Sequence, residues 1–223
     1  SYVFCRQVKD NDTWQEIIAK KNNYKILNYG VGNYGIDQSI LKYSKTNLDK
    51  NVKYIIQGFV PETICRVQSQ WKHFLEFGNL HGFKPKFYLS ENHIKLKKNP
   101  LLKNSKIKDL KKIIKKLTIS DRFYLDKFEK YRIKFPFTIS FFLNLRFNFQ
   151  ILSFYIYYLL FNSFKKKKIN LYENLFSLVV KNNLIFAHCL YKENYSKLLL
   201  SKLIIKFIEI SKKKKTLSNF NYF

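Results

Sequence analysis

Glycine is scarce in this chain, and half of it is concentrated in one short turn. Gly30, Gly32 and Gly35 are three of only six glycines among 223 residues. Glycine accepts a left-handed backbone and leaves room for another group to approach the main chain closely. The turn between Asn28 and Gln38 therefore needs a backbone explanation, either a positive φ or a close approach.

The residues on either side of this turn predict regular structure. Tyr24–Leu27 is a short apolar run, Asp37–Tyr43 has a helical pattern, and Val52–Val60 is rich in β-branched and aromatic residues. We interpret the order strand, turn, helix, strand as a βαβ unit, which predicts a parallel sheet with a right-handed crossover.

The turn also matches the G-x-G-x-x-G pattern of dinucleotide-binding proteins. That pattern is weak evidence without an acidic residue at the end of the next strand, where it would hold the ribose. Val52–Val60 ends without one, since Glu62 follows Pro61 in a predicted loop. We therefore expect no nucleotide and no other cofactor. On spacing alone, a tight strand-to-helix turn without catalytic role is the simplest interpretation.

A helix is predicted just before the turn. Thr13–Lys21 begins with a threonine that can act as N-cap, and Glu16 follows three residues later. This is the capping-box pattern, which marks a helix start.

The charge of the chain is strongly positive. Lys and Arg number 42 against 15 Asp and Glu, a net charge of +27, while 46% of the residues are hydrophobic. That much apolar content predicts a folded protein with a basic surface, because a charge-driven disordered chain carries less. The same excess of lysine also follows from the codon bias of AT-rich genomes, so the charge is either functional or compositional.

Two later segments could contact a charged partner. Lys95–Leu117 reads as a basic helix with one apolar stripe, and we favour a solvated surface helix over a contact with nucleic acid or anionic lipid. Phe147–Phe161 is the most apolar stretch and is followed by Lys165–Lys168. It is too short for a confident membrane span; a buried helix is favoured, and a monotopic membrane-surface contact through Phe147–Lys168 is the alternative. Leu175–Ile210 returns to a helix-forming pattern.

The cysteines favour a reducing compartment. Cys5, Cys65 and Cys189 are odd in number and form no C-x-x-C pair, which argues against a disulfide framework and against a zinc site. No secretory signal is found in Ser1–Trp14. The cytoplasm is thus slightly favoured, but the chain has no methionine and starts in what reads as structured sequence, so we expect a fragment whose missing N-terminus could have held a signal.

Five stretches of the first 90 residues together carry a resemblance to a known family. The most specific is N-Y-G-V-G-N-Y-G-I-D-Q at Asn28–Gln38, supported by S-Y-V-F-C at the start and by the Thr13-Trp14 helix. Two further stretches corroborate it: V-K-Y-I-I-Q-G-F-V-P-E-T-I-C-R ending at Arg66, and G-F-K-P-K-F at Gly82–Phe87. In this order they resemble the N-terminal half of a bacterial SGNH (GDSL-type) hydrolase.

The resemblance implies a fold and a set of site residues. The fold would be a flavodoxin-like three-layer α/β/α sandwich with a parallel sheet, incomplete here. Ser1 falls at the serine of the family's Gly-Asp-Ser turn and would be the nucleophile, while Gly32 or Asn33 would offer a backbone N–H to the oxyanion. The family's third block normally supplies a side-chain Asn, where this sequence has Pro61-Glu62-Thr63, so that Thr63 is the candidate there.

The family's Asp-x-x-His segment is absent, because no histidine follows an aspartate by three residues. The four histidines, each read as a surface or packing residue, are His73, His81, His93 and His188. A serine hydroxyl is weakly nucleophilic until a base removes its proton. The resemblance therefore implies a serine esterase or O-acyltransferase acting on an ester of a carbohydrate or lipid, inactive in these 223 residues alone.

Three regions follow from these patterns. Residues 1–90 would be the hydrolase-like α/β part, 91–174 a basic and aromatic, largely helical insertion, and 175–223 a helical return segment with a polar tail. The alternative function is a basic module that contacts nucleic acid or an anionic membrane. A net charge of +27 gives salt-sensitive binding to any polyanion, but no recognition motif of a nucleic-acid module is present, so specific nucleic-acid binding is not expected.

Overall fold

The computed structural model describes most of the chain: residues 8–32, 34–48, 52–71, 82–101, 107–129, 132–164 and 184–214. Its elements, in chain order, are η1 (Asp10–Asp12), α1 (Trp14–Asn22), α2 (Ile36–Lys45), η2 (Pro61–Thr63), α3 (Ile64–Val67), β1 (Lys86–Ser90), β2 (His93–Lys97), α5 (Ile107–Ser120), the π-helical turn η3 (Tyr124–Glu129), α6 (Phe137–Leu143), α7 (Leu145–Phe164) and α9 (Asn194–Lys213). Residues 184–192 are also helical.

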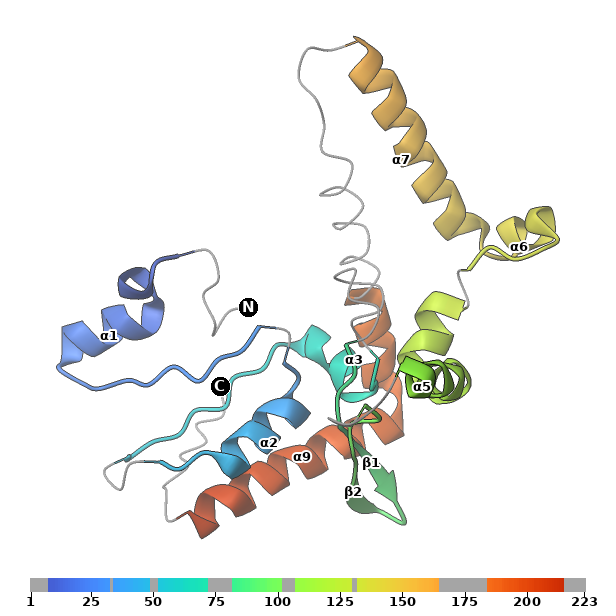
Figure 1. Ribbon diagram of the computed structural model, residues 1–223. Coiled ribbons are helices and arrows are strands. Elements are labelled where there is room, and N and C mark those ends of the chain that lie inside the picture. Colours follow the sequence, from blue (N-terminus) through green and yellow to red (C-terminus); the bar gives the residue numbers. More distant parts are fainter. Residues whose placement is uncertain are drawn as a thin grey trace.

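The predicted flavodoxin-like α/β/α sandwich is wrong. The described residues are mostly helical, and the sheet within them is a two-stranded antiparallel hairpin in which Phe87 pairs with Leu96 (Figure 1). A hairpin needs only a short local turn, whereas parallel strands need a long crossover.

Both predicted strands are extended segments without a ladder. Residues 24–27 and 52–60 form no strand, apart from an isolated bridge at Tyr54. Tyr24 is 68% exposed and Ile56 is 86% exposed, so neither segment lies inside a sheet. β-propensity reflects packing against neighbouring strands more than an intrinsic backbone preference, and among the described residues neither segment forms a ladder with a neighbouring strand.

The first predicted helix is confirmed, with its cap. α1 starts directly after Thr13, whose Oγ1 accepts a hydrogen bond from the Glu16 backbone N–H at 3.4 Å. Its C-cap, Asn23, is left-handed with φ of 52°. The local sequence was sufficient to predict the start of this helix, because capping depends on residues a few positions apart.

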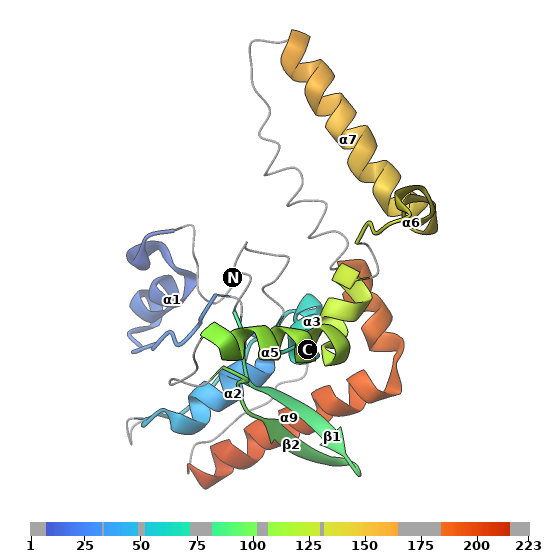
Figure 2. The ribbon, with the colours of Figure 1, turned by 45° about the vertical axis from the view of Figure 1, so that its right-hand side comes forward.

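The main core forms where α2 and α9 lie side by side, with β1 against them (Figures 1 and 2). α2 contributes Ile36 and Ile40, one turn apart, and α9 contributes Leu199 and Leu203 at the same spacing. This spacing places apolar residues on one helix face, which is the condition for packing. At the far end, Lys214 Nζ donates to the Tyr43 carbonyl at 2.9 Å and ties the end of α9 to the end of α2.

Two smaller clusters extend this core. One joins Ile64 and Cys65 of α3 to Phe123, Ala187 and Leu190. The other joins Trp71, Leu117 of α5 and Tyr124, with Trp71 and Tyr124 stacked at 5.2 Å between ring centroids.

The basic helix predicted over Lys95–Leu117 is shorter than expected. Residues 95–97 belong to β2, and the helix is α5. Its lysine face is exposed, as predicted, but Leu117 is buried against Trp71, so α5 does not lie wholly outside the packed body.

The apolar segment Phe147–Phe161 is helical, but the prediction that it is buried is wrong. α7 leads away from the body in both ribbon views (Figures 1 and 2). Large apolar residues along it are about half exposed, among them Phe149, Leu160 and Tyr157. α7 carries apolar side chains all round, so it has no single face to turn toward α2 and α9.

Candidate functional site

The glycine turn contains a close approach, one of the two explanations that the sequence allowed. A Cβ added to Gly35 would lie 2.5 Å from Asp37 Oδ1 and 3.0 Å from Arg66 Cβ. Gly35 itself has φ of −85°, which any residue adopts, so space and not backbone strain selects glycine. Upstream, the Asn28 side chain folds the turn by accepting from the Gly30 N–H at 2.8 Å.

The segment around α3 lies directly beside this turn. Arg66 Nη1 donates a hydrogen bond to the Tyr34 carbonyl at 3.0 Å across 32 residues of sequence. The two segments therefore meet, although they do so at the start of α2 and not at the edge of a parallel sheet.

A buried ion pair lies under the turn. Lys84 Nζ donates to Asp37 Oδ2, and the side chains are 3% and 0% exposed. Asp37 is in the first turn of α2, where the helix dipole favours a carboxylate. Its second oxygen, Oδ1, is buried beside Gly35 and makes no hydrogen bond within the described structure. The pair connects α2 to the segment that enters β1.

A second buried carboxylate organises the chain after α3. Asp121 accepts from Ser69 Oγ at 2.9 Å, from the Gln70 N–H at 2.7 Å and from the Tyr124 N–H at 3.1 Å. Gln70 Nε2 in turn donates to the Lys98 carbonyl at 2.9 Å. These bonds satisfy buried polar groups from three segments, so this network is structural.

The pKa of Lys86 on β1 is shifted by its burial and by its position near Asp121. Burial lowers the pKa of Lys86, and attraction to Asp121 opposes part of that effect. Lys86 Nζ donates to the Gln68 carbonyl at 2.9 Å, which compensates the partly buried ammonium.

A partly buried ion pair links Arg122, just before η3, to the start of α9. Arg122 donates to Glu193 and, at 3.1 Å, to Asp126. The hydrogen bond to Glu193 raises the pKa of Arg122, and the bond from Arg122 lowers the pKa of Glu193. Glu193 also accepts from Ser196 Oγ at 3.0 Å, at the first turn of the helix.

The structure describes two of the four site residues that the resemblance predicts, Gly32 and Thr63. Ser1 and Asn33 lie outside the described residues. Gly32 is half-buried in the turn. Thr63 is buried, and its hydroxyl donates to the Val60 carbonyl at 2.7 Å, so it is engaged in the turn before α3.

The histidines bring no base to this turn within the described structure. His93 is exposed on β2 and His188 is exposed in the helical stretch 184–192. His73 and His81 lie outside the described residues.

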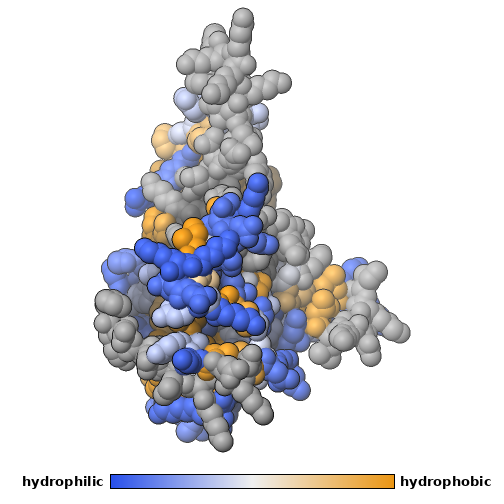
Figure 3. Space-filling model, turned by 90° about the vertical axis from the view of Figure 1, so that its left-hand side faces the viewer, coloured by the Kyte–Doolittle hydropathy of each residue, from blue (hydrophilic) through white to orange (hydrophobic). Residues whose placement is uncertain are grey.

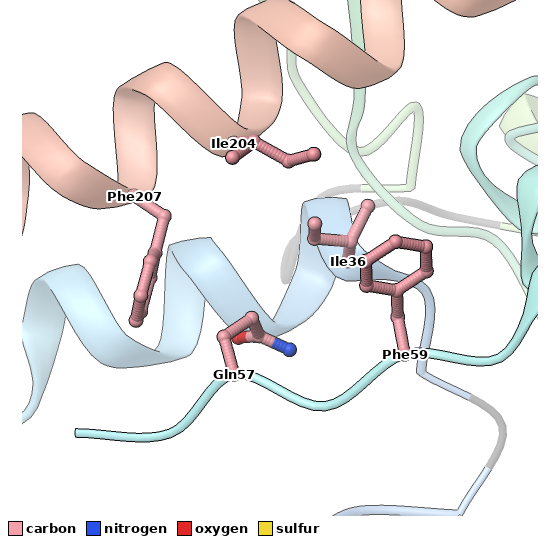
Figure 4. Close-up of a pocket in the computed structure, with 5 residues that line it drawn as sticks. All are labelled: Ile36, Gln57, Phe59, Ile204 and Phe207. Carbon is pink, nitrogen blue, oxygen red and sulfur yellow. The ribbon is translucent and has the colours of Figure 1, made fainter. Parts of the chain in front are cut away.

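The cavity nearest the turn is small. Figure 4 shows its lining: Ile36 from α2, Gln57 and Phe59 from the extended segment, and Ile204 and Phe207 from α9. Its volume of about 40 Å³ is room for a water-sized molecule and not for an ester substrate. The amide of Gln57 is already occupied, because its oxygen accepts from Ser39 Oγ at 3.0 Å.

From the sequence, Asp37 was not paired with Lys84, although both residues stand in the stretches that carry the resemblance. Asp121 and Arg66 were also missed as organising groups. No local pattern predicts these contacts, since the partner stands 47 positions away for Asp37 and 32 for Arg66.

The part of the chain that the structure describes holds no group of three or more metal-ligating side chains. None of its helices combines the length and the apolar character needed to cross a bilayer. The face shown in Figure 3 is predominantly hydrophilic where it is described, with smaller apolar areas between.

Comparisons with protein-family models, with curated proteins and with solved structures found no match to this chain.

Proposed function

We propose that this chain carries the nucleophile and part of the oxyanion site of an SGNH-type serine ester hydrolase or acyltransferase. The substrate class is an ester, such as an O-acyl group of a carbohydrate or lipid. The proposal comes from the resemblance over residues 1–90 and uses its glycine turn; the parallel sheet that the same resemblance implied is not found among the described residues.

The observation that supports it most is the contact between Arg66 and Tyr34. The resemblance assigns oxyanion donors to two separate segments, the glycine turn and the loop Pro61-Glu62-Thr63, and such donors work only when they converge on one atom. The Thr63 hydroxyl and N–H both donate to the Val60 carbonyl, so the donor that the proposal keeps is the backbone N–H of Gly32 or Asn33. The Arg66 hydrogen bond holds those segments side by side. The tight packing at Gly35 adds support, since a bulkier residue would push them apart.

The chemistry would proceed through an acyl-enzyme. The Ser1 oxygen attacks the carbonyl carbon of the ester and loses its proton to a base, the alcohol leaves with a proton, and water or an acceptor hydroxyl then takes the acyl group. Each backbone donor to the oxyanion contributes roughly 3 kcal/mol to the transition state. Because the sequence has no Asp-x-x-His, we expect these 223 residues by themselves to show no turnover.

The test is hydrolysis of p-nitrophenyl acetate by the protein expressed from the complete open reading frame that contains this sequence. We expect Ser1→Ala to reduce the rate to that of buffer. Ser44→Ala is the matched control, because Ser44 is an exposed serine on α2 whose hydroxyl donates to the Leu41 carbonyl of the same helix. Full activity of the Ser1→Ala variant would overturn the assignment of the nucleophile.

A further inference from the structure

α6 and α7 form a unit in which many large apolar side chains are exposed. The two helices meet at Asn144, where Asn148 Nδ2 donates to the Phe141 carbonyl at 2.9 Å and fixes the corner. Beyond this corner α7 leads away from α2 and α9 (Figures 1 and 2).

The exposed residues are large and numerous. On α6 they are Phe137, Ile139, Phe142 and Leu143; on α7 they are Leu145, Phe149, Leu152, Tyr155, Ile156, Tyr157, Leu159 and Leu160. An open apolar hollow on α6 is lined by four residues, of which three are apolar. Apolar residues scattered singly over a surface need no explanation, whereas a concentration of exposed large apolar residues on one unit marks an interaction site.

The charge next to this surface indicates the kind of partner. Lys165–Lys168 follows α7 directly in the sequence, Arg146 is in its first turn, and the whole chain has a net charge of +27. An apolar helix that is followed in the sequence by a cluster of lysines, in a chain of high positive charge, suits a membrane surface with anionic headgroups, where the two attractions add.

The types of apolar residue favour lipid over nucleic acid. Single-stranded nucleic acid binds aromatic side chains by stacking, together with basic residues. Leu152, Ile156 and Leu160 are aliphatic and have no ring on which a base could stack, whereas acyl chains accept them. The tyrosines of α7 also fit, because tyrosine is enriched where hydrocarbon meets headgroups.

From these observations we propose that α6 and α7 bind the surface of an anionic membrane, with exposed apolar side chains of both helices at the level of the upper acyl chains. This goes beyond the proposed ester chemistry and does not depend on it.

The experiment is co-sedimentation of the full chain with vesicles in 150 mM salt. We expect binding to vesicles of phosphatidylcholine with 30% phosphatidylserine, and at least tenfold weaker binding to phosphatidylcholine alone. Leu152→Gln/Ile156→Gln, which changes two exposed residues one turn apart, should weaken binding to the anionic vesicles at least tenfold. The matched control is Ile17→Gln/Ile18→Gln, an equally exposed pair on α1, which should change it less than twofold.

Three results would contradict the proposal, and two of them would identify a different partner for the α7 surface. The proposal is overturned if the α7 variant binds anionic vesicles as well as the unchanged chain does. It is also overturned if only single-stranded DNA binds at this salt, or if the α7 surface proves to be covered by a second copy, seen as a dimer in sedimentation without lipid that the α7 variant abolishes. Circular dichroism confirms that both variants remain helical. Ser1→Ala should bind vesicles normally, which separates this test from that of the proposed function.

Discussion

The helices α9 and α7 are both twenty residues long, yet one is the centre of the core and the other is exposed along its length. α9 places Leu199, Leu203 and Phe207 on one face and lysines on the other, whereas α7 is apolar on all sides. Apolar content alone therefore does not decide burial in this protein. A helix packs when its apolar residues share a face that matches a neighbour, and α2 provides that match for α9 alone.

The largest loss in the free energy of unfolding is expected from breaking the buried ion pair between Asp37 and Lys84. Asp37→Ala leaves Lys84 charged and without its carboxylate in a site that is almost fully buried. Removing one partner of such a pair typically destabilises by about 3–5 kcal/mol. Urea unfolding followed by circular dichroism measures this loss. Glu16→Ala is the control, because its pair with Lys20 is exposed and should contribute less than about 1 kcal/mol; equal effects would contradict a structural role for Asp37.

Truncation of a leucine in each long helix tests the comparison itself. Leu199→Ala removes a fully buried side chain from α9 and should cost about 2–5 kcal/mol. Leu160→Ala removes the same atoms from α7, where the residue is 55% exposed, and should change stability by about 0.5 kcal/mol or less. The same unfolding experiment compares them. A large cost at Leu160 would mean that α7 is packed in solution.

The close packing at the glycine turn gives an intermediate effect. Gly35→Ala places a methyl group against Asp37 and Arg66, and because both are held in place, one segment has to move. Overpacking of this kind costs typically about 1–3 kcal/mol. Unfolding midpoints measure it, and Gly58→Ala in the extended segment is a control outside this packed corner. An unchanged or raised midpoint for Gly35→Ala would show that the corner has room.

The smallest expected effect is the pH dependence at Glu193. Its folded-state pKa is lowered by Arg122, so the stabilisation is present above the unfolded-state pKa, roughly 4.3, and is lost as the pH falls through the lowered value. The pair is about one-third exposed, so its contribution is about 1 kcal/mol or less. Between pH 6 and pH 3, Glu193→Gln should therefore lose less stability than the unchanged chain; an identical pH profile would show that the pair contributes nothing.

Local features of this fold were predictable, and those that depend on distant partners were not. The Thr13 cap and the helix from Asp37 were predicted because their signals lie within a few residues. The close approach at Gly35 was one of two explanations given for the glycine turn. Val52–Val60 was assigned to a sheet on composition, but a strand needs a neighbour that composition does not specify. The pairing of Asp37 with Lys84 likewise depends on a residue 47 positions away, and the exposure of α7 depends on the lack of a matching helix face among the described residues.

The central claim is that the apolar surface of α7 is exposed in solution and becomes covered at an anionic membrane. Thiol labelling of Leu152→Cys, with Cys5 and Cys189 changed to serine, tests it most directly; Cys65 is buried, and Ser44→Cys on α2 is the reference site. Both new thiols should react rapidly in buffer, and phosphatidylserine vesicles should slow Leu152→Cys at least tenfold while leaving Ser44→Cys unchanged. Slow labelling of Leu152→Cys in buffer, or labelling that vesicles do not affect, would contradict the claim.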